Sequence, residues 1–74
     1  MTSTPAAPNP HKRLAQTAKA SRIAVVLAGA DINPATMTDH SWEIVARIAR
    51  VTPPSEETRA LVVEMLLERA RRIA

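Results

Sequence analysis

TPPSEE, residues 52–57, marks the boundary that decides how this chain folds. The first proline keeps the residue before it out of helical geometry, so a helix that precedes it is expected to end near Val51. Ser55 is placed to cap the next helix, and Glu56 and Glu57 would face the positive end of its dipole. The stretch therefore predicts two helices joined by a short turn that contains two prolines.

Residues 56–72 are predicted to form the last helix of the chain. Arginines near its end, at positions 69, 71 and 72, match the negative end of the helix dipole. When successive residues are placed about 100° apart, one broad apolar face appears. This face consists of Val62, Val63, Leu66, Leu67, Ala70 and Ile73.

A second, narrower apolar stripe lies beyond a polar strip on the same helix. Leu61 and Met65 form this stripe one turn apart, and Glu68 and Arg72 flank it. The pair either touches the first helix within a shared core or contacts another protein. Both interpretations stay open here, because single exposed apolar residues are common on soluble proteins.

The helix before the proline turn is predicted over residues 39–51, with Thr38 as its N-cap. Trp42 is the single aromatic residue of the chain and would be the largest anchor of this helix. The expected apolar face is formed by Trp42, Val45, Ile48 and Ala49.

A first helix is predicted over residues 11–28, and Gly29 is placed to end it in a left-handed conformation. Residues 31–34 then form a turn. Residues 23–28 are apolar on every face, which indicates burial or a protein interface. One stripe at helical spacing is expected to face the core, namely Leu14, Ala18, Ser21, Val25 and Ala28.

Residues 1–10 contain three prolines, which favour an extended, disordered tail. The sequence thus predicts an all-α protein with a flexible Pro/Ala-rich tail over residues 1–10. A small three-helix domain follows over residues 11–74. Since the chain has 74 residues, no cysteine and one aromatic residue, its core is small. Burial against a protein partner or a second copy would add to its stability.

The charge of the chain is divided unevenly. Residues 1–30 hold four cationic side chains and no acidic one, whereas residues 31–74 hold six arginines and seven acidic residues. A segregated positive charge of this kind suits an anionic partner such as nucleic acid. The candidate contacts to phosphate are Lys12, Arg13, Lys19, Arg22, Arg47, Arg50 and Arg59.

Residues 46–61 loosely resemble a helix-turn-helix, in which Arg50 stands where glycine is usual and residues 51–52 match the apolar-small pair of the turn. The resemblance implies a DNA-binding regulator whose last helix would read bases. The sequence departs from that pattern in two places. The turn is lengthened by two prolines, and Glu56 and Glu57 occupy the start of the recognition helix, where they would repel phosphate.

Catalytic signatures are missing from the sequence. A single glycine excludes a glycine-rich phosphate loop, and the lack of cysteine excludes thiolate ligands for zinc. His40 and Glu43 lie one turn apart, but two ligands are a weak signal for a metal. His40 and Ser41 are adjacent on a helix and do not face each other as a catalytic pair would. We expect no enzyme activity, no cofactor, no metal site and no small-molecule substrate.

The apolar run 23–28 follows a basic stretch, as in secretory signals, yet a long proline-containing segment precedes it. The run is too short to span a bilayer. The absence of cysteine fits a reducing compartment. We therefore expect a cytoplasmic protein without a transmembrane segment.

Two functions fit these patterns. The leading one is a non-enzymatic regulator or adaptor that binds a protein partner, or itself, through apolar helix faces. Its expected interface is Trp42, Leu61, Met65, Glu68 and Arg72. On this interpretation, Leu61→Asp together with Met65→Asp abolishes association while helicity is kept. The alternative is a small dimeric DNA-binding regulator with a basic N-terminal arm.

Overall fold

The computed structural model describes residues 10–73, with side chains from Arg13 onward, and it confirms an all-α fold. Three α-helices, α1 (Pro10–Ala30), α2 (Asp39–Ala49) and α3 (Glu56–Ile73), are joined by loops, the first of which contains a short 3₁₀ helix, η1 (Pro34–Thr36). Of the predicted tail, residues 1–9 lie outside the described part, and Pro10 already belongs to α1.

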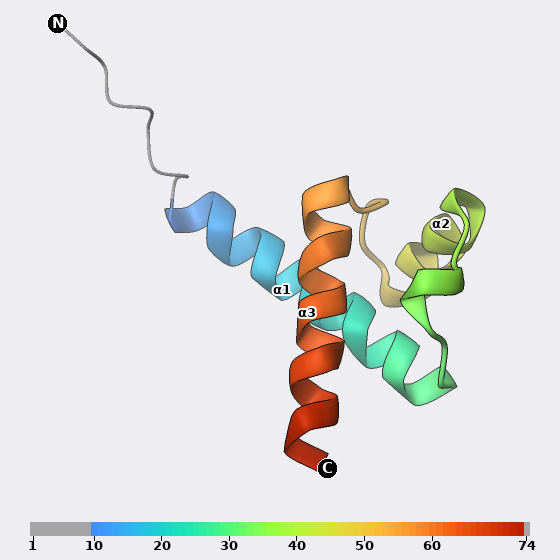
Figure 1. The fold of residues 1–74 in the computed structure, drawn as a ribbon. Coiled ribbons are helices and arrows are strands. Elements are labelled where there is room, and N and C mark those ends of the chain that lie inside the picture. The colour runs from blue at the N-terminus through green and yellow to red at the C-terminus, as the bar shows by residue number, and fades with distance from the viewer. Residues whose placement is uncertain (1–9, 74) are drawn as a thin grey trace, which may run out of the picture.

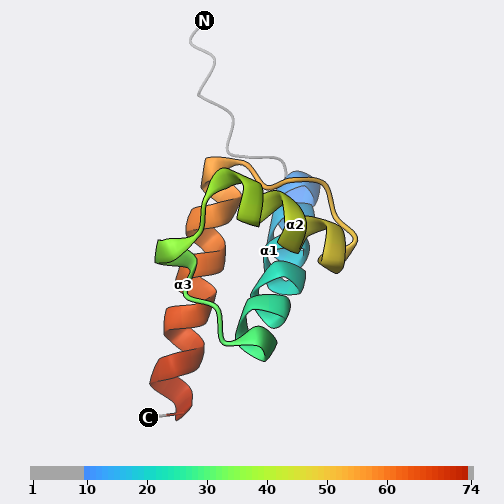
Figure 2. The same ribbon diagram turned by 90° about the vertical axis from the view of Figure 1, so that its right-hand side faces the viewer.

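Helix α1 is the centre of the fold. It packs against both other helices, and α3 crosses it while α2 covers its C-terminal half on one side (Figures 1 and 2). Where α1 and α3 cross, small residues of α1 are buried beside larger ones. The small side chains allow the two helices to approach closely. The buried core consists of Ala20, Ile23, Ala24, Leu27, Trp42, Val45, Ala49 and Val62.

The core face of α1 differs from the expected stripe. Leu14 and Val25 are exposed, whereas Ile23 and Leu27 are completely buried. For Val25 the prediction was wrong because the second half of α1 is apolar on every face. Helical periodicity then fixes no direction, and the position of α3 selects the side that is buried.

Both predicted helix ends before residue 52 require correction. Helix α1 continues through Gly29, and Asp31 takes the left-handed conformation instead, with φ 54°. Likewise α2 ends at Ala49, and Arg50 adopts φ 60° and ψ 45°. Each end is closed by a pair of backbone hydrogen bonds of the Schellman type, such as Ile32 N–H to Leu27 O at 3.0 Å.

The predicted N-caps are confirmed. Thr38 Oγ1 accepts a hydrogen bond from the Ser41 amide at 3.2 Å, and Ser55 Oγ accepts one from the Thr58 amide at 3.3 Å. These caps satisfy amide groups that have no partner within the helix. On the face of α2, three of the four expected residues are buried, but Ile48 is 63% exposed.

Candidate functional site

The C-terminal half of α3 extends beyond the body formed by α1 and α2 (Figures 1 and 2). Only Thr58 and Val62 of this helix are buried. Part of the broad apolar face is therefore left uncovered, since Leu67 is 56% and Ile73 76% exposed. The helix is longer than the surface available to cover it.

A groove of about 770 Å³ lies between this half of α3 and the middle of α1. Its apolar lining includes Ala24 and Val25 from α1 and Leu61 and Met65 from α3. Charged side chains border the groove along α3, namely Glu64, Glu68, Arg69, Arg71 and Arg72. The result is an apolar channel with a mixed charged rim.

Four of the five residues expected at a partner interface line this groove. Leu61 and Met65 are partly buried and pack against the core, while Glu68 and Arg72 stand at the rim. Of the two open interpretations of the Leu61/Met65 stripe, packing within the core is confirmed, whereas contact with another protein stays a prediction. The two residues support the fold on one side and border the groove on the other, so aspartate at both positions is expected to destabilise the fold as well.

The fifth expected interface residue, Trp42, lies in the core. It is 5% exposed and does not line the groove, so it offers almost no surface to a partner. In a chain without phenylalanine or tyrosine, the one large aromatic side chain fills the space between helices.

The rim of the groove carries weak internal ion pairs. Glu68 is 3.7 Å from Arg72 and 3.9 Å from Arg71, and all three side chains are more than half exposed. Exposed pairs of this kind contribute little to stability. Their charges therefore remain available to a ligand at the groove.

The candidate nucleic-acid residues are spread over the molecule. Arg13, Arg22, Arg47 and Arg50 are exposed, and none forms an ion pair with an acidic side chain of the described part. The side chain of Lys12 lies outside the described residues.

Lys19 has a structural role that the sequence did not indicate. Its Nζ donates to Thr52 Oγ1 at 2.7 Å and to Pro53 O at 3.3 Å, which ties α1 to the loop between α2 and α3. The partners are 33 and 34 residues away, so no local pattern could reveal them.

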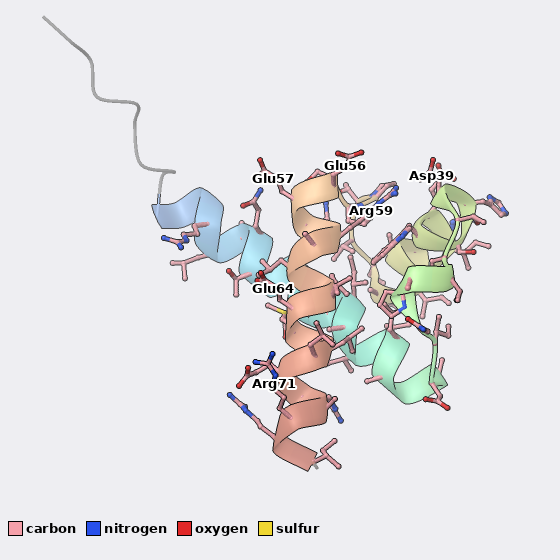
Figure 3. All side chains as sticks on the ribbon, viewed as in Figure 1. Asp39, Glu56, Glu57, Arg59, Glu64 and Arg71 are labelled. Atoms are coloured by element: carbon pink, nitrogen blue, oxygen red, sulfur yellow. The ribbon has the colours of Figure 1, made fainter. Side chains whose placement is uncertain are left out.

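Arg59 is engaged within the fold. Its Nη1 donates to Asp39 Oδ1 at 2.7 Å (Figure 3). Its guanidinium lies 5.4 Å from the centre of the Trp42 ring. This arrangement joins α3 to the start of α2. Arg59 is the one cation in the first turns of α3, and these internal contacts engage it. The neighbouring carboxylates of Glu56 and Glu57 are exposed.

The helix-turn-helix resemblance is matched only in part by this geometry. Arg50 does adopt the left-handed conformation that the turn of that motif requires. However, the exposed first turn of α3 is acidic, and Arg59 points toward Asp39 rather than outward (Figure 3). The start of α3 therefore has no free cation to offer a DNA base.

Other chemistry is limited in residues 10–73. No group of three or more potential metal ligands comes together among the described side chains of residues 13–73, and His40 and Glu43 form only an exposed 4.0 Å contact. A second hollow of about 280 Å³, which the sequence analysis did not predict, is lined by Ile32, Met37, Ile44 and Ile48 together with small polar residues.

No described helix combines the length and apolar character needed to cross a membrane.

Comparison with known proteins gives no relative for this chain: no family model, no curated protein and no solved structure matches it.

Proposed function

We propose that this protein is a non-enzymatic interaction module, a small cytoplasmic regulator or adaptor, which binds an amphipathic helix of another protein in the groove between α1 and α3. One observation carries the proposal. The groove is large, its floor is apolar, and no element among residues 10–73 covers it.

The chemistry of the groove defines the occupant. An amphipathic helix places apolar side chains every three to four residues, which suits a channel walled by Val25, Leu61 and Met65. The rim holds three arginines and two glutamates, so it is basic toward the end of α3. A partner helix that carries acidic residues at one end would complement this charge.

A selection experiment tests the proposal. A displayed library of amphipathic helical peptides is selected on the full chain and counter-selected on the Val25→Asp variant. We expect enriched peptides with apolar residues at helical spacing and an acidic end. Val25→Asp should weaken their binding at least about tenfold, because the variant places a charge on the floor of the groove.

Val25 is 60% exposed, so the substitution should leave the fold intact, as circular dichroism can verify. Ile48→Asp is the matched control, because Ile48 is similarly exposed but lies on α2 away from the groove. If every recovered peptide binds the Val25→Asp variant as well as it binds the Ile48→Asp variant, the proposal is contradicted.

DNA binding is a second candidate, supported by Arg13, Arg22, Arg47 and Arg50, which are exposed and form no ion pair with the described acidic side chains. Lys19 of α1 also lies at the loop that follows Arg50, where it donates to Thr52 and Pro53. For this function we expect micromolar affinity for random duplex DNA at low salt, measured by fluorescence anisotropy, and a steep loss at physiological salt. Substitution of Arg47 and Arg50 by alanine should weaken binding to all sequences alike. Absence of binding at low salt would leave the cations as solubilising surface.

A further inference from the structure

We propose that the outer face of α3 is a self-association surface, on which a second copy of this chain packs its own α3 in the antiparallel direction. Helix α3 spans 18 residues, yet only Thr58 and Val62 of it are buried, and Leu61, Met65 and Leu66 are partly buried against the core. In both ribbon views, the side of α3 turned away from α1 carries no other element (Figures 1 and 2).

The outer face has the residue pattern of a helix–helix seam. Ala60, Val63, Leu67 and Ala70 follow one another at intervals of three, four and three residues, which is the spacing of a heptad seam. They lie more than a quarter turn around the helix from the buried Thr58 and Val62. We call these four residues the outer stripe. Its larger members stand at the centre, and an alanine at each end allows close approach of a second helix.

The outer stripe is open to solvent. Leu67 is 56% exposed, Val63 is partly buried, and both alanines are exposed. A leucine that is exposed between other apolar positions has free energy to gain from contact with a second apolar surface. The outer stripe therefore offers the exposed apolar area that an interface needs.

Charge decides which partner fits and in which direction. Helix α3 begins with Glu56 and Glu57 and ends with three arginines. Glu57 and Arg71 lie 14 residues apart along the same edge of the stripe (Figure 3). In an antiparallel pair, Glu57 of one copy faces Arg71 of the other, and the symmetry repeats this contact at the opposite end. A parallel pair would instead bring acid beside acid and base beside base.

Two local features modify the contact. Arg71 lies 3.9 Å from Glu68 within its own chain, and the pair is exposed, so the arginine is free to exchange partners. Glu64 lies midway between Glu57 and Arg71 and would meet its own copy near the symmetry axis. That repulsion, together with the short stripe, makes a weak dimer with a dissociation constant on the order of 100 µM.

Sedimentation equilibrium of the full chain tests the proposal. We expect the mass to rise from 8.0 kDa toward twice that value as the concentration increases. Ala60→Gln together with Ala70→Gln should raise the dissociation constant at least about tenfold, because the longer side chains keep the helices apart. Ala15→Gln is the matched control on the exposed surface of α1 and should have no effect.

Charge exchange tests the direction of packing. Glu57→Lys and Arg71→Glu should each weaken dimerisation, while an equimolar mixture of the two variants should form a heterodimer. In that mixed pair, both ends of the antiparallel contact again join opposite charges. Glu64→Gln should strengthen the dimer. Circular dichroism of each variant separates a change in association from loss of helix.

The proposal stands apart from the helix-binding groove. Glu64, Leu67 and Arg71 border that groove too, but Ala60, Val63 and Ala70 do not. Val25→Asp should therefore leave the dimer unchanged. A chain that stays monomeric up to millimolar concentration would overturn the proposal. So would a dimer that Val25→Asp abolishes, because a second copy would then occupy the groove itself.

Discussion

Trp42→Ala lowers the free energy of unfolding by about 3–5 kcal/mol, the usual cost of removing a large buried aromatic side chain. Trp42 is 5% exposed and packs in the cluster that joins α1, α2 and α3. A domain of this size is expected to have a total stability of about 4–11 kcal/mol. The substitution should therefore remove a large part of it. Urea unfolding followed by far-ultraviolet circular dichroism measures the effect.

Ile48→Ala is the control for this prediction. Ile48 belongs to the same helix and was expected on the same face, yet it is 63% exposed. Its truncation should change the free energy of unfolding by less than about 1 kcal/mol. If the two variants lost the same stability, Trp42 would not be the main anchor of α2.

Arg59→Ala is expected to lower the free energy of unfolding by about 1–2 kcal/mol. The loss combines the ion pair with Asp39, the contact of the guanidinium with the Trp42 ring and the packing of the aliphatic stem. Arg59 Nε is buried without a hydrogen-bond partner among the described residues, and the cost of that burial offsets part of the gain.

A double-mutant cycle with Asp39→Asn separates these contributions. Because the Asp39 carboxylate is largely exposed, the coupling between the two residues should be only about 0.5 kcal/mol and should decrease with added salt. Most of the effect of Arg59→Ala should remain in the Asp39→Asn background. Loss of the whole effect there would assign the role of Arg59 to the ion pair alone.

The two halves of α3 differ in their contacts with the rest of the fold. The first half is fixed by Thr58 and Val62 against the body, and Arg59 holds it to α2. The second half presents exposed apolar side chains between charged ones, and both the groove and the outer stripe extend into it from the first half. Under the two proposals, a change on the outer stripe would leave these anchoring contacts in place.

Sequence patterns predicted the candidate site in part. Leu61, Met65, Glu68 and Arg72 were recognised as a stripe because their spacing on one helix is a local property, and they do line one groove. Val25 across the groove was instead expected in the core, and Trp42, although expected to anchor its helix, was also assigned to the partner interface. Both depend on how α1 lies against its neighbours, which no single helix encodes.

The sequence by itself determined the number of helices, the caps at Thr38 and Ser55, and the proline break at residues 52–57. These features arise from φ restriction and from hydrogen bonds between residues close in the chain, so they can be predicted from neighbours alone. Only the tertiary structure decided which apolar side of α1 is buried, how much of α3 stays uncovered, and that Lys19 and Arg59 connect helices. Those outcomes depend on the crossing of helices distant in sequence, since an apolar side chain is buried only where another element is present to cover it.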